Sequence, residues 1–202
     1  IADFFVEDVF SRQTEELQNF LLQTSVLERF CPAMCDSVLQ IANSRRLIDQ
    51  CESAGLFLQD LDQTRTWYRY HHLFSEFLRR QLQDQQPRAS AGLYRRAAEW
   101  LTASGLHAEA FDCALKGPDP IYAAQILDAH CESMFAAGMQ PAVQAMANRL
   151  PQHILALHPR LMLIVAWRLI AEWQLPEARS LVAVASDRLK EMARATPGLP
   201  GI

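Results

Sequence analysis

The stretch that decides the fold reads Trp67-Tyr68-Arg69-Tyr70-His71-His72-Leu73-Phe74-Ser75-Glu76-Phe77-Leu78. Its first four residues are three aromatics and a cation, a composition typical of a β-strand. From Leu73 onward the apolar residues recur with the spacing of one helical face. We therefore predict a strand that runs directly into a helix, with two adjacent histidines at the junction.

The residues around this stretch predict a winged-helix domain over residues 1–86. The first ten residues have the spacing of an amphipathic helix. Three more helices are marked by residues typical of helix ends, namely Thr14 and Ser44 as N-caps, Pro32 as a first residue and Gly55 as a stop. The runs Leu56–Leu61 and Trp67–Tyr70 flank a polar loop and predict a β-hairpin. Three helices, a hairpin and a helix ending before Pro87 follow the order of a winged helix.

Residues 87–202 predict a different architecture, a tetratricopeptide-like series of helical hairpins. The predicted turns at Gly105, Gly138 and Gln174 are 33 and 36 residues apart, close to the 34-residue period of such repeats. An irregular link over Pro151–Pro159 interrupts the pattern. The fold class is therefore mostly α, with a winged helix and its one small β-hairpin followed by an α-α superhelical domain.

Composition and charge disfavour several classes of function. The formal net charge is −4, so the chain has no excess of cations to neutralise a nucleic acid backbone. In the third winged-helix helix, Arg45 and Arg46 are offset by Asp49 and Glu52. We therefore expect no direct binding of nucleic acid by this segment.

The remaining motifs favour a cytoplasmic protein without catalytic or metal chemistry of its own. Five scattered cysteines suit a reducing compartment, and their spacing is not that of a zinc site. The most apolar run, Leu161–Ile170, is too short to cross a membrane, and no signal peptide opens the chain. The sequence contains neither a phosphate-binding loop nor a nucleophile elbow. We expect no enzyme activity, no bound metal and no membrane partner.

The residues alone leave two interpretations open for His71 and His72. Adjacent residues at a helix start are expected to point in different directions, one toward a cleft and the other toward solvent. Such a histidine is either bonded to backbone or faces an anion, such as phosphate, at the positive end of the helix. For Trp100, Trp167 and Trp173 the alternatives are packing in the repeat core and a sensor pocket between helices.

Three segments resemble one known family. Trp67–Leu78 is similar to the signature of the winged helix in MalT-like, ATP-dependent LuxR-family transcriptional regulators. Phe20–Leu27 resembles the second helix of that domain, and Ala97–Leu101 with Gly105 resembles the first repeat helix that follows it. The resemblance implies an interior segment, which contains the winged helix and the N-terminal part of a helical-repeat sensor.

The same resemblance implies a role for His71. In that family a nucleotide-binding module of the STAND class precedes the winged helix, and a LuxR-type helix-turn-helix ends the protein. Tyr70-His71-His72 is similar to the Met-His-Asp motif of plant immune receptors and apoptotic switch proteins, whose histidine contacts a phosphate of bound ADP. The resemblance thus places His71 at the phosphate of ADP held by the nucleotide-binding domain, while His72 replaces the aspartate.

The resulting expectation is a regulatory segment of an ATP-dependent transcriptional activator. ATP or ADP would be bound by the complete protein, and the winged helix would hold the ADP-bound off state against its own nucleotide-binding domain. The helical repeats would receive an inducer or a regulatory protein, and activation would bring self-association. Two rivals are a free-standing helical-repeat scaffold for protein interactions and a DNA-binding winged-helix repressor.

Overall fold

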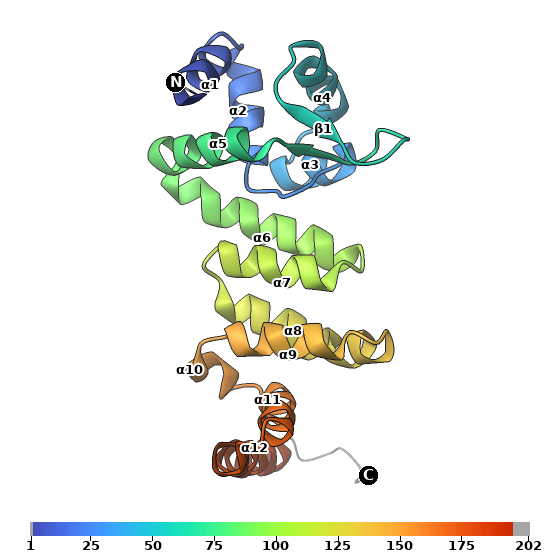
Figure 1. Cartoon of the computed structure of the whole chain (residues 1–202), viewed down its shortest axis with the longest axis vertical. Helices are drawn as coiled ribbons and strands as arrows, with labels where there is room; N and C mark the ends of the chain where they lie inside the picture. The colour runs from blue at the N-terminus through green and yellow to red at the C-terminus, as the bar shows by residue number, and fades with distance from the viewer. Residues whose placement is uncertain (1, 196–202) are drawn as a thin grey trace. The chain divides into compact units, whose positions relative to one another are not determined.

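The computed structural model describes residues 2–195, and the chain is largely helical over this range (Figure 1). Its elements are, in chain order, α1 (Ala2–Ser11), α2 (Glu15–Thr24), α3 (Pro32–Leu39), α4 (Ser44–Ser53), β1 (Leu58–Asp60), β2 (Tyr68–Tyr70), α5 (His72–Gln85), α6 (Pro87–Ala103), α7 (His107–Lys116), α8 (Pro120–Ala136), α9 (Gln140–Arg149), α10 (Gln152–Leu155), α11 (Pro159–Ala171) and α12 (Leu175–Ala195). The prediction of a mostly α chain with one small β-hairpin is confirmed.

The chain folds as two compact units. The first reaches Gly105 and also takes in Lys116–Pro118, whereas the second comprises Leu106–Leu115 and the residues from Asp119 onward. Helix α6 belongs to the first unit because it packs on α3 and α5, and Arg96 of α6 donates a hydrogen bond to the carbonyl of Val38. The domain boundary that the sequence suggested at Pro87 stays a prediction.

The helices of the first unit begin close to where the sequence predicted. Thr14 is the N-cap of α2, where its hydroxyl accepts a hydrogen bond of 3.4 Å from the amide of Leu17, and Pro32 opens α3. Ser44 was predicted as an N-cap, and this was wrong by one residue. Asn43 is the N-cap of α4, and the amide of Ser44, the first helical residue, donates a hydrogen bond of 3.0 Å to the carboxylate of Asp36.

The predicted hairpin lies between α4 and α5, with Leu58 opposite Tyr70 and Asp60 opposite Tyr68. A further pairing, which the sequence does not predict, lies on the other side of β2. Phe30 and Tyr68 exchange two backbone hydrogen bonds of 2.8 Å, which form an isolated antiparallel bridge. The side chains of both residues are fully buried, so the hairpin is fixed in the core of the winged helix.

In the second unit, α8 with α9 and α11 with α12 form the predicted hairpins (Figure 1). The first of these turns uses Gly138 at φ +78°. The second was predicted at Gln174, but the left-handed residue is Trp173 at φ +61°. The amide of Gln174 instead closes the turn by bonding to the carbonyl of Leu169 at 2.8 Å. The predicted irregular link before α11 contains the short helix α10.

The three tryptophans lie in different environments. Trp100 of α6 packs edge to face against Trp67, with ring centroids 6.2 Å apart. By contrast, Trp167 is 72% exposed and Trp173 is 84% exposed. Of the two interpretations, core packing is therefore wrong for Trp167 and Trp173, since neither residue is covered by the described part of its unit.

All five cysteines are free and buried. Burial raises the pKa of the Cys51 thiol to about 12 and that of Cys35 well above its usual range. These two thiols are therefore protonated at neutral pH and pack as small apolar groups. Within residues 2–195, no helix has both the length and the apolar character needed to span a bilayer.

The turn after α8 gives a prediction about backbone strain. A Cβ at Gly138 would have open space around it, so Gly138→Ala should act through the positive φ alone and destabilise the protein by about 1 kcal/mol. The matched control is Gly92→Ala within α6, which should stabilise by about 0.5–1 kcal/mol because alanine is the better helix former. Thermal unfolding followed by circular dichroism measures both changes. Equal effects of the two substitutions would contradict the assignment of strain to the turn.

Candidate functional site

A cleft of about 490 Å³ opens where β2 passes into α5. It is polar, and the residues that line it are Glu28, Gln59, Arg69, Tyr70, His71, His72, Ser75, Glu76 and Arg79. Most of them come from the stretch that decides the fold and from the next two turns of α5. Ser75 and Arg79 lie four and eight residues after His71, a spacing that places them along one side of the helix.

His71 occupies the N-cap position of α5 with an extended backbone, at φ −56° and ψ 140°. Its amide donates to the carbonyl of Phe57 at 2.8 Å, and its carbonyl accepts from the amide of Ser75 at 3.0 Å. Its imidazole makes no capping hydrogen bond to the helix. The backbone of His71 is therefore held on both sides, while the ring is left to face the cleft.

His72 is the first residue of α5 and lies beside His71 in the same cleft, with ring centroids 4.4 Å apart. The expectation that the two histidines point in different directions is wrong. The angular step of about 100° per residue holds only within a helix, whereas His71 still has the extended conformation of the strand. The change of backbone conformation at the junction brings both imidazoles to one side.

Two arginines supply positive charge to the cleft. Arg69 donates from its Nε to the side chain of Gln59 at 3.1 Å, and Arg79 donates from its Nε to the carbonyl of Ser25 at 2.8 Å. These bonds orient both guanidinium groups at the cleft wall. Glu28 on the same wall forms an ion pair with Lys116, and the hydrogen bond from Lys116 lowers the pKa of Glu28.

Tyr70 anchors the strand immediately before His71. Its hydroxyl shares a buried hydrogen bond of 2.8 Å with the hydroxyl of Thr24 on α2. Its ring packs edge to face on Phe74 at 5.6 Å and against Phe30 at 4.9 Å. Burial raises the pKa of Tyr70 well above its usual range, so the phenol stays neutral. The position of His71 is thus set by a neighbour that is fixed in the core.

This arrangement suits the binding of an anion. The first turn of a helix has amide groups without intrahelical partners and carries partial positive charge. At α5 the N-cap side chain makes no capping hydrogen bond, and two histidines and two arginines line the cleft beside it, together with the carboxylates of Glu28 and Glu76. Metal binding is a separate question, and among the described residues no group of three or more histidine, cysteine or acidic side chains is placed to hold a metal ion.

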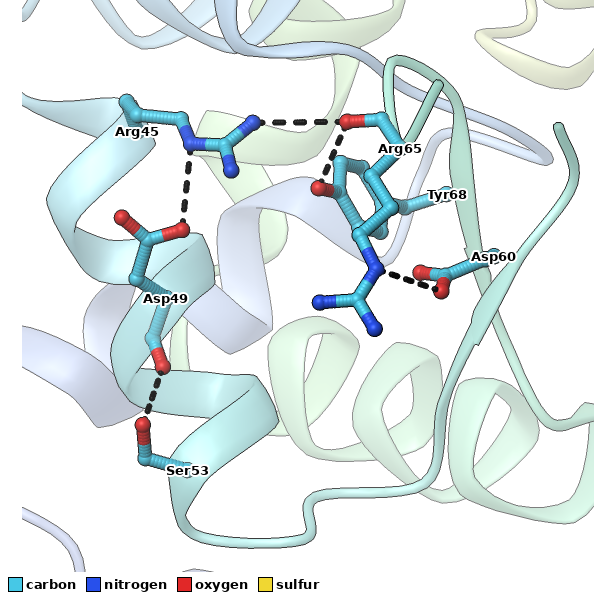
Figure 2. A network of polar contacts seen from close by, with 6 residues as sticks. All are labelled: Arg45, Asp49, Ser53, Asp60, Arg65 and Tyr68. Atoms are coloured by element: carbon cyan, nitrogen blue, oxygen red, sulfur yellow. Dashed lines mark hydrogen bonds and ion pairs between the residues drawn. The ribbon is translucent and has the colours of Figure 1, made fainter. Parts of the chain in front are cut away.

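The loop end of the hairpin, far from the junction with α5, is bonded to α4 by a network of polar contacts (Figure 2). Arg45 bonds both to the carboxylate of Asp49 at 3.0 Å and to the carbonyl of Arg65 at 3.3 Å. That carbonyl also accepts from the hydroxyl of Tyr68 at 2.7 Å, and the guanidinium of Arg65 lies 3.5 Å from Asp60. Arg45 of α4 and Arg65 of the hairpin loop therefore both make contacts within the domain.

The cleft and the surrounding helices lie in a segment that matches a known family. Residues 6–90 match the family model of the MalT winged helix domain. These residues are a MalT winged helix domain. The prediction of a MalT-like segment, which came from the same strand and helix, is confirmed.

Two relatives extend the similarity beyond the MalT winged helix. The chain is 32% identical over 191 residues to the HTH-type transcriptional regulator MalT of Vibrio cholerae, an alignment that covers 94% of this chain and 21% of that protein. It is also 32% identical over 167 residues to the serine/threonine-protein kinase PknK of Mycobacterium tuberculosis, covering 83% of this chain and 15% of the kinase. The chain thus spans about a fifth or less of these relatives.

Sequence reasoning found part of this site. It placed His71 at the start of a helix but did not single out Arg69, which also lines the cleft. It missed Arg79 and Glu28, although the spacing of Arg79 from His71 by eight residues was a usable signal. No local signal points to Glu28, which reaches the cleft only through the tertiary fold.

The hydrogen bond between Tyr70 and Thr24 gives the prediction for this site. Tyr70→Phe removes a buried hydroxyl, and it should reduce the free energy of unfolding by about 1 kcal/mol. Thr24→Val removes this bond and also the bond of the threonine hydroxyl to the carbonyl of Phe20, so it should cost more, about 1–2 kcal/mol. In a double-mutant cycle the two changes should be less than additive. Full additivity in urea unfolding would contradict a direct bond.

Proposed function

We propose that this chain is a regulatory and sensor segment of an ATP-dependent bacterial transcriptional activator. In the complete protein, its own nucleotide-binding domain would dock on the cleft of the MalT winged helix, with a phosphate of ADP facing His71. The observation that carries this proposal is the free imidazole of His71 at an uncapped helix start in a cleft with two arginines. That placement would make the winged helix a latch for the ADP-bound off state.

The geometry of His71 supports this role over a purely structural one. A histidine that served only to cap α5 would bond to a first-turn amide, and His71 does not. Its imidazole and the open amides of the helix start instead offer donors on one side of the cleft. Arg69 and Arg79 lie on the same wall and would complement the charge of a diphosphate.

The helical repeats would receive the signal, either an inducer or a regulatory protein. A ligand that binds the open arrangement better than the closed one shifts the population toward the open state. Loss of the winged-helix contact would then release ADP, admit ATP and allow self-association. The segment itself would contribute no catalytic group, and nucleotide binding would belong to the complete protein.

The two relatives support a regulatory role for this segment rather than the activity, transcription or phosphorylation, for which each complete protein is named. Similar segments occur in one protein named as a transcriptional regulator and in another named as a kinase. A module that accompanies two different outputs does not itself determine either output. The longer alignment with MalT, over 94% of this chain, favours the transcriptional regulator for the complete protein.

Two further expectations belong to this proposal. A cytoplasmic location suits five cysteines that are all free, because a reducing compartment keeps thiols unpaired. Direct binding of nucleic acid by this segment is disfavoured, because Arg45, Arg46 and Arg65 each have an acidic partner within the domain. DNA binding would be the task of a helix-turn-helix elsewhere in the complete protein.

The role of His71 can be tested in the complete protein. His71→Ala should weaken ADP retention about tenfold or more, because a hydrogen bond to a charged phosphate is lost, and it should raise transcription without inducer. Leu73→Ala is the control, because Leu73 is exposed on the first turn of α5 but does not line the cleft, and it should change ADP affinity less than threefold. Equilibrium dialysis and a reporter assay measure the two effects. Unchanged ADP affinity together with unchanged basal transcription would refute the latch.

The absence of direct nucleic acid binding can be tested on this segment alone. Purified chain should show no salt-dependent association with random duplex DNA, because its net charge is −4 and the cations of α4 are paired. Fluorescence anisotropy of a labelled duplex over a range of salt concentrations gives the slope. A steep loss of binding with rising salt would revive the repressor alternative.

A further inference from the structure

A second cavity, of about 370 Å³, lies within the helical-repeat unit and is separate from the cleft at His71. It is formed where α9 and α11 pack against each other and against α8. Six residues line it: Phe135, Gln140, Gln144, Leu163, Ile164 and Trp167. Its volume falls in the lower part of the range of small-molecule sites in proteins.

The walls of this cavity are supported by the core of the unit. On α9, the residues that face inward are Val143, Met146 and Ala147, and all three are buried. On α11, Val165 and Ala166 are likewise buried. The lining side chains therefore project from helices whose opposite faces are fixed, so the cavity is a formed feature of the unit.

Trp167 is the most unusual residue of the lining. Its side chain is 72% exposed, and Leu163 one turn earlier is 41% exposed. Large apolar groups left uncovered beside a cavity are typical of binding surfaces. Trp167 and Phe135 bring two aromatic rings to the lining, and aromatic rings favour stacked or edge-to-face contacts with another ring.

The polar groups of the lining are two carboxamides and no charges. Gln140 donates from its Nε2 to the carbonyl of Phe135 at 3.2 Å, which leaves its oxygen to accept. Gln144 lies one turn further along α9, and its carboxamide makes no hydrogen bond to the described residues. A half-buried carboxamide without a partner in an apolar cavity is a ready donor and acceptor for a ligand.

We propose that this cavity binds a small uncharged aromatic compound that carries an amide or hydroxyl group. The ring would lie against Trp167, and the polar group would bond to Gln144. A charged ligand is excluded because no lining residue would compensate its desolvation. The further identification of this cavity as the inducer site rests on the proposed function, in which the helical repeats receive the signal.

The experiment titrates the purified 202-residue chain with benzamide, which combines an aromatic ring with an uncharged amide. Two-dimensional NMR should show the indole N–H resonance of Trp167 shifting with a millimolar dissociation constant, while the resonance of Trp173 stays in place. Cyclohexanecarboxamide should bind at least threefold more weakly because it lacks the aromatic face. Benzoate should bind at least tenfold more weakly because its charge would be buried without a partner.

Variants locate the binding groups. Gln144→Leu should weaken benzamide about fivefold, through loss of one hydrogen bond, and Trp167→Ala about tenfold, both measured by ligand-observed NMR. Trp173→Ala is the matched control, because Trp173 is also exposed in this unit but does not line the cavity. It should bind benzamide as the unmodified chain does.

The outcomes separate this inference from the proposed function. No shift at Trp167 with millimolar benzamide, or equal binding of benzamide and benzoate, would overturn the assignment of the cavity. An unchanged affinity in Gln144→Leu and Trp167→Ala would do the same. Failure of the latch at His71 would be seen in ADP retention by the complete protein and would leave the benzamide result unaffected.

Discussion

The backbone pairing of Tyr68 is the constraint on which the winged helix depends. Tyr68 exchanges two hydrogen bonds of 2.8 Å with Phe30, and it lies opposite Asp60 on the other side. A strand that is paired on both sides cannot slip by one residue without breaking both sets of contacts. Since Tyr70 and His71 follow within three residues, the same pairing fixes where α5 begins and which way its first turn faces.

The two ends of the hairpin consequently differ in chemistry. At the loop end, Arg65 and its neighbours are bonded to α4 and to each other, so the charges are largely compensated (Figure 2). At the junction with α5, the backbone of His71 is satisfied but its imidazole is not. A buried or half-buried polar group without a protein partner is where a ligand gains most from binding. The polar groups that lack a partner within the domain therefore lie at the cleft rather than at the loop end of the hairpin.

The correct sequence predictions rest on local physics, and the errors come from contacts between distant residues. Thr14 and Pro32 mark helix starts through their own side chains, and the aromatic run at Trp67 marks a strand by composition. Ser44 is the first helical residue rather than the N-cap, and its amide bonds to the carboxylate of Asp36, eight residues earlier in the chain. The sequence predicts only the part of the cleft that the strand and the following helix form. Glu28 reaches the cleft through tertiary packing, which no local sequence pattern encodes.

The surface of α11 shows that exposed aromatic residues need not contribute to the stability of the fold. Trp173 adopts the left-handed conformation that Gly138 adopts in the preceding hairpin, at a cost of about 1 kcal/mol for a residue with a Cβ. Its ring is 84% exposed, so burial within the described unit does not offset that cost. Trp167 is similarly uncovered, while the inward faces of α9 and α11 form the core. The exposed aromatic residues are therefore not part of the core that stabilises the helices. A substitution of Trp167 can change the surface of α11 without unfolding that helix.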